Sequence, residues 1–298
     1  MIVVFALIVV ALGTVVFHFV SPWWWTPIAS NWGYIDDTIL ITFWVTGVVF
    51  LAVVLFMAYC IYRFRYQENK RAEYNPESKK LEWWLTGLTT LGVVVMLTPG
   101  LFVWNQFVTV PEGAAEFEVM GQQWQWSFRF PGKDGALGTT NARKINGDNP
   151  FGIDPKDPNG QDDVLVEGGE LHLPVDQPVK VLLRSIDVLH DFYVPEFRAK
   201  MDMVPGAITY FWLTPTRTGT FDILCFELCG VGHHDMRGNV VVEEESAFQE
   251  WLNEQTTFAQ SVAETSKKDG PKLASSKAAI NSVSTGSTRR DLNRSSRF

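Results

Sequence analysis

Cysteine and histidine are both scarce in this sequence, with 3 Cys and 5 His among 298 residues. Any metal site must therefore draw its sulfur and imidazole ligands from a short list. Positive charge is scarce in the second half of the chain, where residues 111–256 hold 24 Asp and Glu against 11 Lys and Arg, a balance of −13. Such an acidic segment is a poor binder of nucleic acid and suits the docking of a basic partner protein.

Charged residues are missing from three long apolar runs in the first third of the chain, residues 2–20, 39–62 and 83–104. A membrane-spanning helix takes about 20 residues, so each run predicts a transmembrane helix. Tryptophans flank the third run, as they do at membrane interfaces. Residues 1–20 could instead form a cleaved signal peptide, although no Lys or Arg precedes this run and no small-residue cleavage site closely follows it.

The connectors between these runs differ in charge. The connector 21–38 has no Lys or Arg. The connector 63–80 has six basic residues: Arg63, Arg65, Lys70, Arg71, Lys79 and Lys80. Basic loops stay in the cytoplasm, so the large segment after the third run is expected on the outer side of the membrane.

The pattern changes after residue 111. Short alternating or β-branched runs separated by Gly and Pro predict an all-β sandwich or barrel over residues 111–256. These runs are Glu116–Phe130, Val164–Val166, Val179–Ser185, Ile208–Leu213, Thr220–Cys225 and Asn239–Glu243. Residues 131–163, rich in Gly, Asn, Asp and Pro, predict a surface insertion. Residues 246–256 predict a short helix, and the basic segment 257–298 predicts a disordered tail.

Soft metal ligands are concentrated in one stretch of twelve residues, which contains Cys225, Cys229, His233 and Met236. Thiolate, imidazole and thioether together favour copper over magnesium, calcium or manganese. His190 is the last residue of a strand-like run over residues 181–190 and can supply a second imidazole. A mononuclear blue-copper site needs only one Cys, so two thiols suggest two metals. A disulfide between the two Cys and a structural zinc site are the alternatives.

The remaining candidate ligands have simpler interpretations. His234, beside His233, is expected to face solvent or to support the site without binding metal. His172 and His18 are interpreted as structural residues of a strand and a membrane span. Cys60, in the second span, is interpreted as a small buried apolar residue.

Three motifs make the chain resemble subunit II of the haem-copper cytochrome c oxidases over most of residues 30–256. The first is C-x-E-x-C-G-x-x-H-x-x-M at residues 225–236, with S-x-D-V-x-H at residues 185–190 upstream. The others are K-x-D-x-x-P-G at residues 200–206 and G-x-Q-W-x-W-S at residues 121–127. The resemblance implies N-terminal transmembrane helices followed by a cupredoxin-like Greek-key barrel that holds the dinuclear copper centre CuA.

The resemblance also implies roles for individual residues. The expected copper ligands are His190, Cys225, Cys229, His233, Met236 and the backbone carbonyl of Glu227. The Glu227 carboxylate is expected to reach a magnesium ion shared with subunit I. Trp126 is the candidate residue through which electrons enter, although a tryptophan in a β-domain is more often core. Glu82 matches a carboxylate at the entrance of a proton channel, and could equally be an interfacial residue near Lys79 and Lys80. Gln125 departs from the family pattern, which has an aromatic residue there.

The function expected from this resemblance is electron transfer. The chain would accept electrons from cytochrome c and pass them to the haem of subunit I, where oxygen is reduced. It would lie in a bacterial inner membrane with the copper domain on the periplasmic side. The alternative is the CuA subunit of a nitric-oxide-reducing haem-copper complex. A copper-storage or assembly protein is a further alternative, but it would not need the tryptophan motif.

Overall fold

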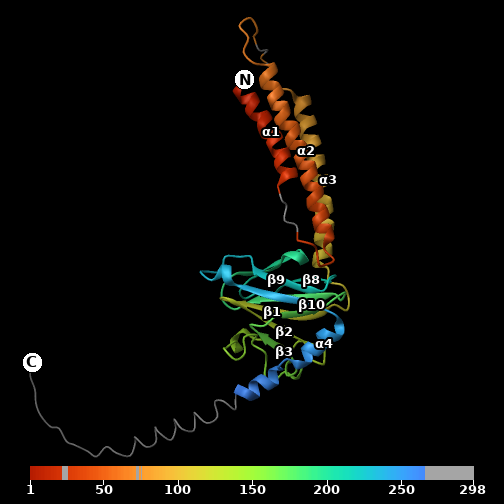
Figure 1. Ribbon diagram of the computed structural model, residues 1–298, viewed down its shortest axis with the longest axis vertical. Coiled ribbons are helices and arrows are strands. Elements are labelled where there is room, and N and C mark those ends of the chain that lie inside the picture. The colour runs from red at the N-terminus through yellow and green to blue at the C-terminus, as the bar shows by residue number, and fades with distance from the viewer. Residues whose placement is uncertain (22–25, 72–73, 75, 266–298) are drawn as a thin grey trace, which may run out of the picture.

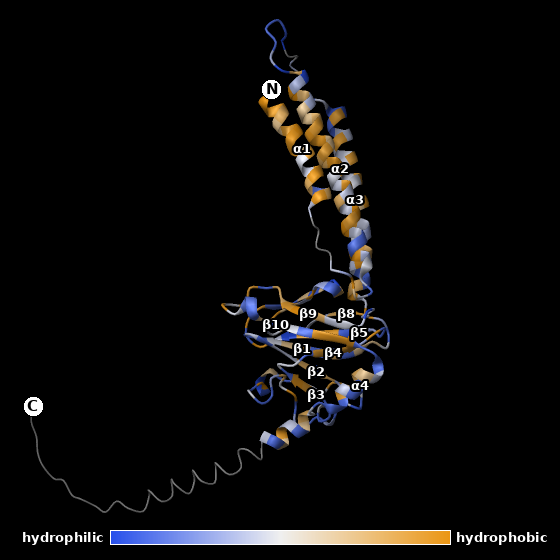
Figure 2. Ribbon diagram, viewed as in Figure 1, coloured by the Kyte–Doolittle hydropathy of each residue, from blue (hydrophilic) through white to orange (hydrophobic). Residues whose placement is uncertain are grey.

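The computed structural model describes residues 1–21, 26–71, 74 and 76–265, which form a helical stalk and a β-domain (Figure 1). The stalk contains α1 (Ile2–Val20), α2 (Gly33–Arg63) and α3 (Lys79–Val108). All three are long and apolar enough to cross a membrane, by length and composition, and their surfaces are largely hydrophobic (Figure 2). α2 and α3 are longer than the apolar runs 39–62 and 83–104, because polar residues continue each helix at both ends.

α1 and α2 pack side by side in opposite directions. Met1 Sδ lies 3.7 Å from Arg65 Nη1 at one end of the pair, and the rings of His18 and Trp44 are 6.0 Å apart near the other. Ala11 of α1 is buried, and a small side chain lets helix backbones approach closely in a membrane. The start of α1 therefore lies at the same end of the stalk as the basic connector that follows α2 (Figure 1).

The β-domain consists of two five-stranded sheets. One has the order β3-β2-β1-β5-β8 and the other the order β4-β10-β9-β6-β7. The strands are β1 (Ala115–Gln122), β2 (Gln125–Phe130), β3 (Val164–Glu167), β4 (Leu171–Pro174), β5 (Val179–Ser185), β6 (His190–Val194), β7 (Ala199–Met203), β8 (Thr209–Leu213), β9 (Gly219–Cys225) and β10 (Arg237–Glu243). Helix α4 (Glu245–Glu254) follows. This confirms the predicted class of transmembrane-type helices followed by an all-β cupredoxin-like domain.

Alternation of side chains along the strands builds the core between the sheets. In β5, Val179, Val181 and Leu183 are buried, whereas Lys180 and Arg184 lie on the opposite face. Successive side chains of a strand point to opposite faces, so this pattern gives one apolar face per strand. The inner faces of both sheets then exclude water from the strands that position the metal ligands.

The stalk is attached to the β-domain by specific contacts near β8. Trp32, which is almost fully buried, donates from Nε1 to the carbonyl of Trp212 at 2.9 Å. Trp212 donates from its own Nε1 to the carbonyl of Gln106, near the end of α3, also at 2.9 Å. Arg198 donates to both carboxylate oxygens of Asp36 in α2, at 2.7 and 2.9 Å. The β-domain is therefore held in a fixed position relative to α2 and α3.

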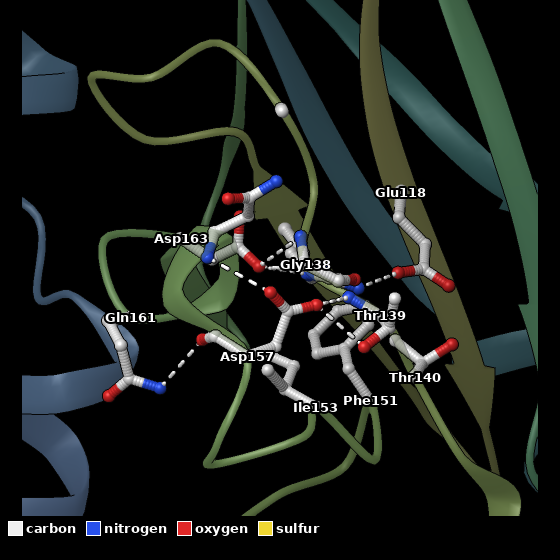
Figure 3. A network of polar contacts seen from close by, with 12 residues as sticks. Glu118, Gly138, Thr139, Thr140, Phe151, Ile153, Asp157, Gln161 and Asp163 are labelled. Carbon is white, nitrogen blue, oxygen red and sulfur yellow. Dashed lines mark hydrogen bonds and ion pairs between the residues drawn. The ribbon is translucent and has the colours of Figure 1, made fainter.

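The predicted insertion 131–163 is folded, and its residues Gly138 and Asp163 take part in a network of polar contacts (Figure 3). Arg129 is 1% exposed and pairs with Glu118 at 2.8 Å and with Asp163 at 2.6 Å. It also donates to the carbonyl of Gly138 inside the insertion. The insertion contains two short 3-10 helices, η1 (Ala142–Lys144) and η2 (Pro158–Gly160).

The prediction of a disordered tail from residue 257 onward was wrong for residues 257–265. Thr257 pairs with Val164 of β3, and residues 258–265 are helical. Phe258 is 1% exposed and joins a second small core with Phe151 and Ile153 of the insertion. Burial of one large aromatic side chain can order a polar segment, because it removes apolar surface from water. The composition of the segment does not show that the β-domain provides a place for this side chain. Residues 266–298 lie outside the described part of the chain.

Candidate metal centre

The predicted ligands come from two neighbouring strands and the loop after one of them. Cys225 is the last residue of β9, His233 lies in η4 (His233–Asp235), and Met236 directly precedes β10. His190 opens β6, whereas the sequence had suggested that it ends the preceding strand; residues 186–189 form a turn between β5 and β6. β6 and β9 are antiparallel neighbours, with Phe192 opposite Cys225, so His190 is brought to the ligand loop.

The two thiols lie beside each other, and the ligand atoms of His190, Cys225 and Cys229 are all within 4.8 Å of one another. The Sγ atoms of Cys225 and Cys229 are 3.7 Å apart. Nδ1 of His190 lies 3.8 Å from Cys225 Sγ, and Nδ1 of His233 lies 3.6 Å from Cys229 Sγ. Each thiol therefore has an imidazole beside it, and in both rings the nitrogen that faces the thiol is Nδ1.

Two weaker donors complete the arrangement. The carbonyl oxygen of Glu227 lies 3.3 Å from Cys225 Sγ, and Sδ of Met236 lies 3.9 Å from Cys229 Sγ. The imidazoles and the weak donors therefore form two similar halves around the thiol pair, and the two halves share these thiols. Soft sulfur and imidazole donors suit copper, so the residues present fit a two-copper centre.

The alternative interpretations fit this geometry less well. The Sγ–Sγ separation of 3.7 Å is far from the disulfide bond length of about 2.05 Å, and both thiols are free. A structural zinc site takes four Cys or His ligands in a closed tetrahedron and does not use a thioether. A mononuclear blue-copper site uses one Cys and two His, so it would leave one of the two thiols without a metal to bind.

The local environment gives the two thiols different pKa values. Burial raises the pKa of the Cys225 thiol, but hydrogen bonds with His190 and with the backbone at Asp191 lower it more, so the pKa falls to about 6. Burial and the neighbouring Cys225 sulfur raise the pKa of Cys229 to about 11. Since the thiolate is the metal-binding form, metal binding must displace the proton of Cys229.

A carboxylate outside the ligand set orients one imidazole. Asp187 Oδ1 lies 2.8 Å from Nε2 of His190, which leaves Nδ1 facing Cys225. Burial raises the pKa of Asp187, but hydrogen bonds from the Gln123 backbone N–H and from His190 outweigh it and lower the pKa. Such a partner fixes the tautomer and the orientation of a metal-binding histidine. Asp187 is the acidic residue of the S-x-D-V-x-H motif, to which the sequence had assigned no role.

Comparison with known proteins shows the family of this chain. Residues 116–244 match the sequence model of "Cytochrome C oxidase subunit II, periplasmic domain". The alternative cytochrome c oxidase subunit 2 of Bradyrhizobium diazoefficiens is 67% identical over 253 residues, which cover 85% of this chain and 91% of that protein. The chain belongs to the cytochrome c oxidase subunit II family.

More distant members are also similar to this chain. Cytochrome c oxidase subunit 2 of Cereibacter sphaeroides is 27% identical over 241 residues, 77% of each chain. A crystal structure of the periplasmic domain of subunit II of cytochrome oxidase from Bradyrhizobium japonicum is 28% identical, with a TM-score of 0.36, and the match covers 49% of this chain and 95% of that one. Subunit II is part of a haem-copper oxidase, and this chain is accordingly a membrane protein with an external β-domain.

The two tryptophans of the G-x-Q-W-x-W-S motif have different positions. Trp126 is 3% exposed and packs edge-on against Phe192 in the core between the sheets. Trp124 is 39% exposed and lies against the ligand loop, where a Cβ added to Gly232 would come within 2.4 Å of its Cδ2. These positions argue against Trp126 as the residue that a donor meets first. Trp124, which connects the surface to the ligand loop, is the better placed of the two.

A charged cluster that the sequence did not reveal lies beside the ligands. Nζ of Lys200 is 3.1 Å from Asp191, 3.5 Å from Asp202 and 3.7 Å from the carboxylate of Glu227. Asp191 is fully buried, and burial together with the neighbouring Asp202 raises its pKa to about 7. Lys200 and Asp202 belong to the K-x-D-x-x-P-G motif, whereas Asp191 lies directly after the S-x-D-V-x-H motif and belongs to neither.

Other predicted residues lie away from the centre. His234 is exposed and pairs with Asp235 at 3.1 Å, in keeping with a residue that does not bind metal. His172 stacks on Trp251 of α4. Glu82 is in the first turn of α3, whereas the opposite end of that helix contacts β8. The channel role of Glu82 therefore stays a prediction.

Proposed function

We propose that this subunit II accepts electrons from a cytochrome c and passes them to the haem of subunit I, where oxygen is reduced. The observation that carries the proposal is the pairing of each buried thiol with its own imidazole and its own weak donor. The proposed ligands are His190, Cys225, Glu227 through its carbonyl, Cys229, His233 and Met236. When bound, two copper ions would supply reversible acceptance and release of one electron.

The protein's own residues keep this centre rigid and dry. β6 and β9 fix His190 and Cys225 through backbone pairing, and Asp187 fixes the ring of His190. The geometry of the centre changes little when it gains an electron only if packing has already fixed the positions of its ligands. Trp124, in contact with the ligand loop and partly exposed, provides a short covalent and van der Waals route from the surface.

The remaining parts of the proposal concern the donor, the partner subunit and the orientation in the membrane. The acidic balance of residues 111–256 would attract a basic donor protein. The Glu227 carboxylate would reach a magnesium ion shared with subunit I, and Glu82 would lie at a proton-channel entrance. Because the basic connector follows α2, the positive-inside rule places the β-domain on the periplasmic side of a bacterial inner membrane.

The direct test is to purify the complex that contains this chain and to measure oxygen uptake with reduced cytochrome c. We expect turnover that depends on copper, and an apparent donor affinity that falls as ionic strength rises, since the screening length shrinks from about 10 Å at 0.1 M to about 3 Å at 1 M salt. Reduction of nitric oxide without reduction of oxygen would contradict the proposal. A flat salt response would instead show an apolar docking face or a tethered donor.

A further inference from the structure

The hairpin between β1 and β2 covers the ligand loop and contacts both halves of the metal centre. Gln122 pairs with Gln125 at the base of the turn, so Gln123 and Trp124 form its tip. The backbone N–H of Gln123 donates to Asp187 Oδ2 at 2.7 Å. The side-chain amide of the same residue donates from Nε2 to the carbonyl of Cys229 at 2.8 Å.

We propose that Gln123 is a positioning residue that fixes the two halves of the centre relative to each other. Its backbone holds Asp187, whose other carboxylate oxygen contacts His190, in one half. Its side chain holds the peptide of Cys229, on the loop that carries His233 in the other half. One residue from outside the ligand set thus connects both, and this inference rests on the two-copper centre proposed above.

The ligand loop has little room to compensate for the loss of this contact. Gly230 has a φ of +125°, and a Cβ at that position would lie 3.0 Å from Gln123 Nε2 and 3.1 Å from Trp124 Cζ2. Gly232 is packed still more closely against the Trp124 ring. The hairpin tip and the loop are therefore in direct contact over several residues, and the hydrogen bond to Cys229 is the polar contact that sets the orientation of the peptide after this ligand.

Equal sharing of one electron between two metals requires two equivalent halves. Removing the amide of Gln123 frees the carbonyl of Cys229 while the backbone bond to Asp187 remains. The loop that carries His233 should then shift while His190 keeps its position through Asp187, so the two coppers become inequivalent. A residue with only a structural role would change stability and leave this electronic property unchanged.

The test uses the full-length chain, purified in detergent and loaded with copper, with Gln123→Leu and Gln123→Glu. The second variant keeps the size of the side chain but, when ionised, cannot donate to a carbonyl. We expect both to retain two coppers, to lose the regular seven-line hyperfine pattern in electron paramagnetic resonance, and to shift in reduction potential. Gln125→Leu, an exposed glutamine of the same hairpin, is the control and should leave spectrum and potential unchanged.

The outcomes separate this inference from the proposed function. If the unmodified chain binds one copper, the two-copper centre itself is wrong. If the unmodified chain shows the two-copper spectrum and both Gln123 variants share that spectrum and potential, the positioning role is overturned, even where the variants melt at lower temperature. Spectra changed equally by Gln125→Leu would also overturn it, because the effect would then belong to the hairpin as a whole.

Discussion

Replacement of Arg129 by methionine tests whether the buried ion cluster holds the insertion to the β-domain. Arg129 pairs with Glu118 at 2.8 Å and with Asp163 at 2.6 Å, and all three side chains are almost fully buried. Without Arg129, Glu118 still has Arg184 at 2.7 Å, but Asp163 keeps only the backbone N–H of Gly138 at 3.1 Å. Removing one partner of a buried pair costs about 3–5 kcal/mol, because the other charge stays buried without compensation.

For a domain of this size, each kcal/mol lowers the melting temperature by about 2–4 °C, so Arg129→Met should lower it by about 6–20 °C. The assay is thermal unfolding of the full-length chain in detergent, followed by near-ultraviolet circular dichroism. Lys144→Met is the matched control in the same insertion, since the Lys144–Asp154 pair is about one-third exposed. A pair that is screened by solvent contributes little to stability, so Lys144→Met should leave the melting temperature almost unchanged, and equal losses in both variants would refute the reasoning.

The same variant predicts a dependence on pH. Burial raises the pKa of Asp163, and the charge of Arg129 opposes this rise. Without Arg129 the pKa of Asp163 should rise further. A carboxyl group whose pKa is higher in the folded than in the unfolded state destabilises the fold above its unfolded pKa, and this cost decreases as pH falls through the folded pKa. The stability deficit of Arg129→Met should therefore shrink in more acidic buffer, and a deficit that grows there would contradict the assignment.

Two further predictions concern the tryptophans and the end of the chain. Trp124→Phe should slow electron transfer from the donor in stopped-flow measurements while the copper content is unchanged. Trp126→Phe should lower the melting temperature and have little effect on this rate. The reverse pattern would restore Trp126 as the point of electron transfer into the subunit. Phe258→Ala should cost about 3–5 kcal/mol of stability, since Phe258 fills the second core. A chain that ends at Thr265 should keep its copper. Loss of copper from this shortened chain would show that residues 266–298 are needed.

The sequence predicted the helices and most strands because their signals are local. The three apolar runs and the alternation in Val179–Ser185 each follow from a few adjacent residues. β6 and β7, of five residues each, were missed because their apolar residues are interrupted by charged ones such as Asp191 and Lys200. Pairing between these two strands, and not local pattern, forms them.

The ligand residues were predicted more fully than their surroundings. Spacing alone groups Cys225 and Cys229, because they belong to one loop. The role of Gln123 depends on a hairpin that brings it to a residue 106 positions away in the chain, which spacing does not reveal. The difference in exposure between Trp124 and Trp126 also depends on the structure, since Trp124 lies in the turn, where strand alternation no longer applies.

The measurement that tests the central claim most directly is copper content together with electron paramagnetic resonance of the purified full-length chain. One unpaired electron shared by two equivalent copper nuclei of spin three-halves gives seven hyperfine lines, so the unmodified chain should bind two coppers and show seven lines. Cys229→Ser should abolish this pattern and leave at most one loosely bound copper, because a hydroxyl is a much harder ligand than a thiolate. One copper and four lines in the unmodified chain would contradict the account.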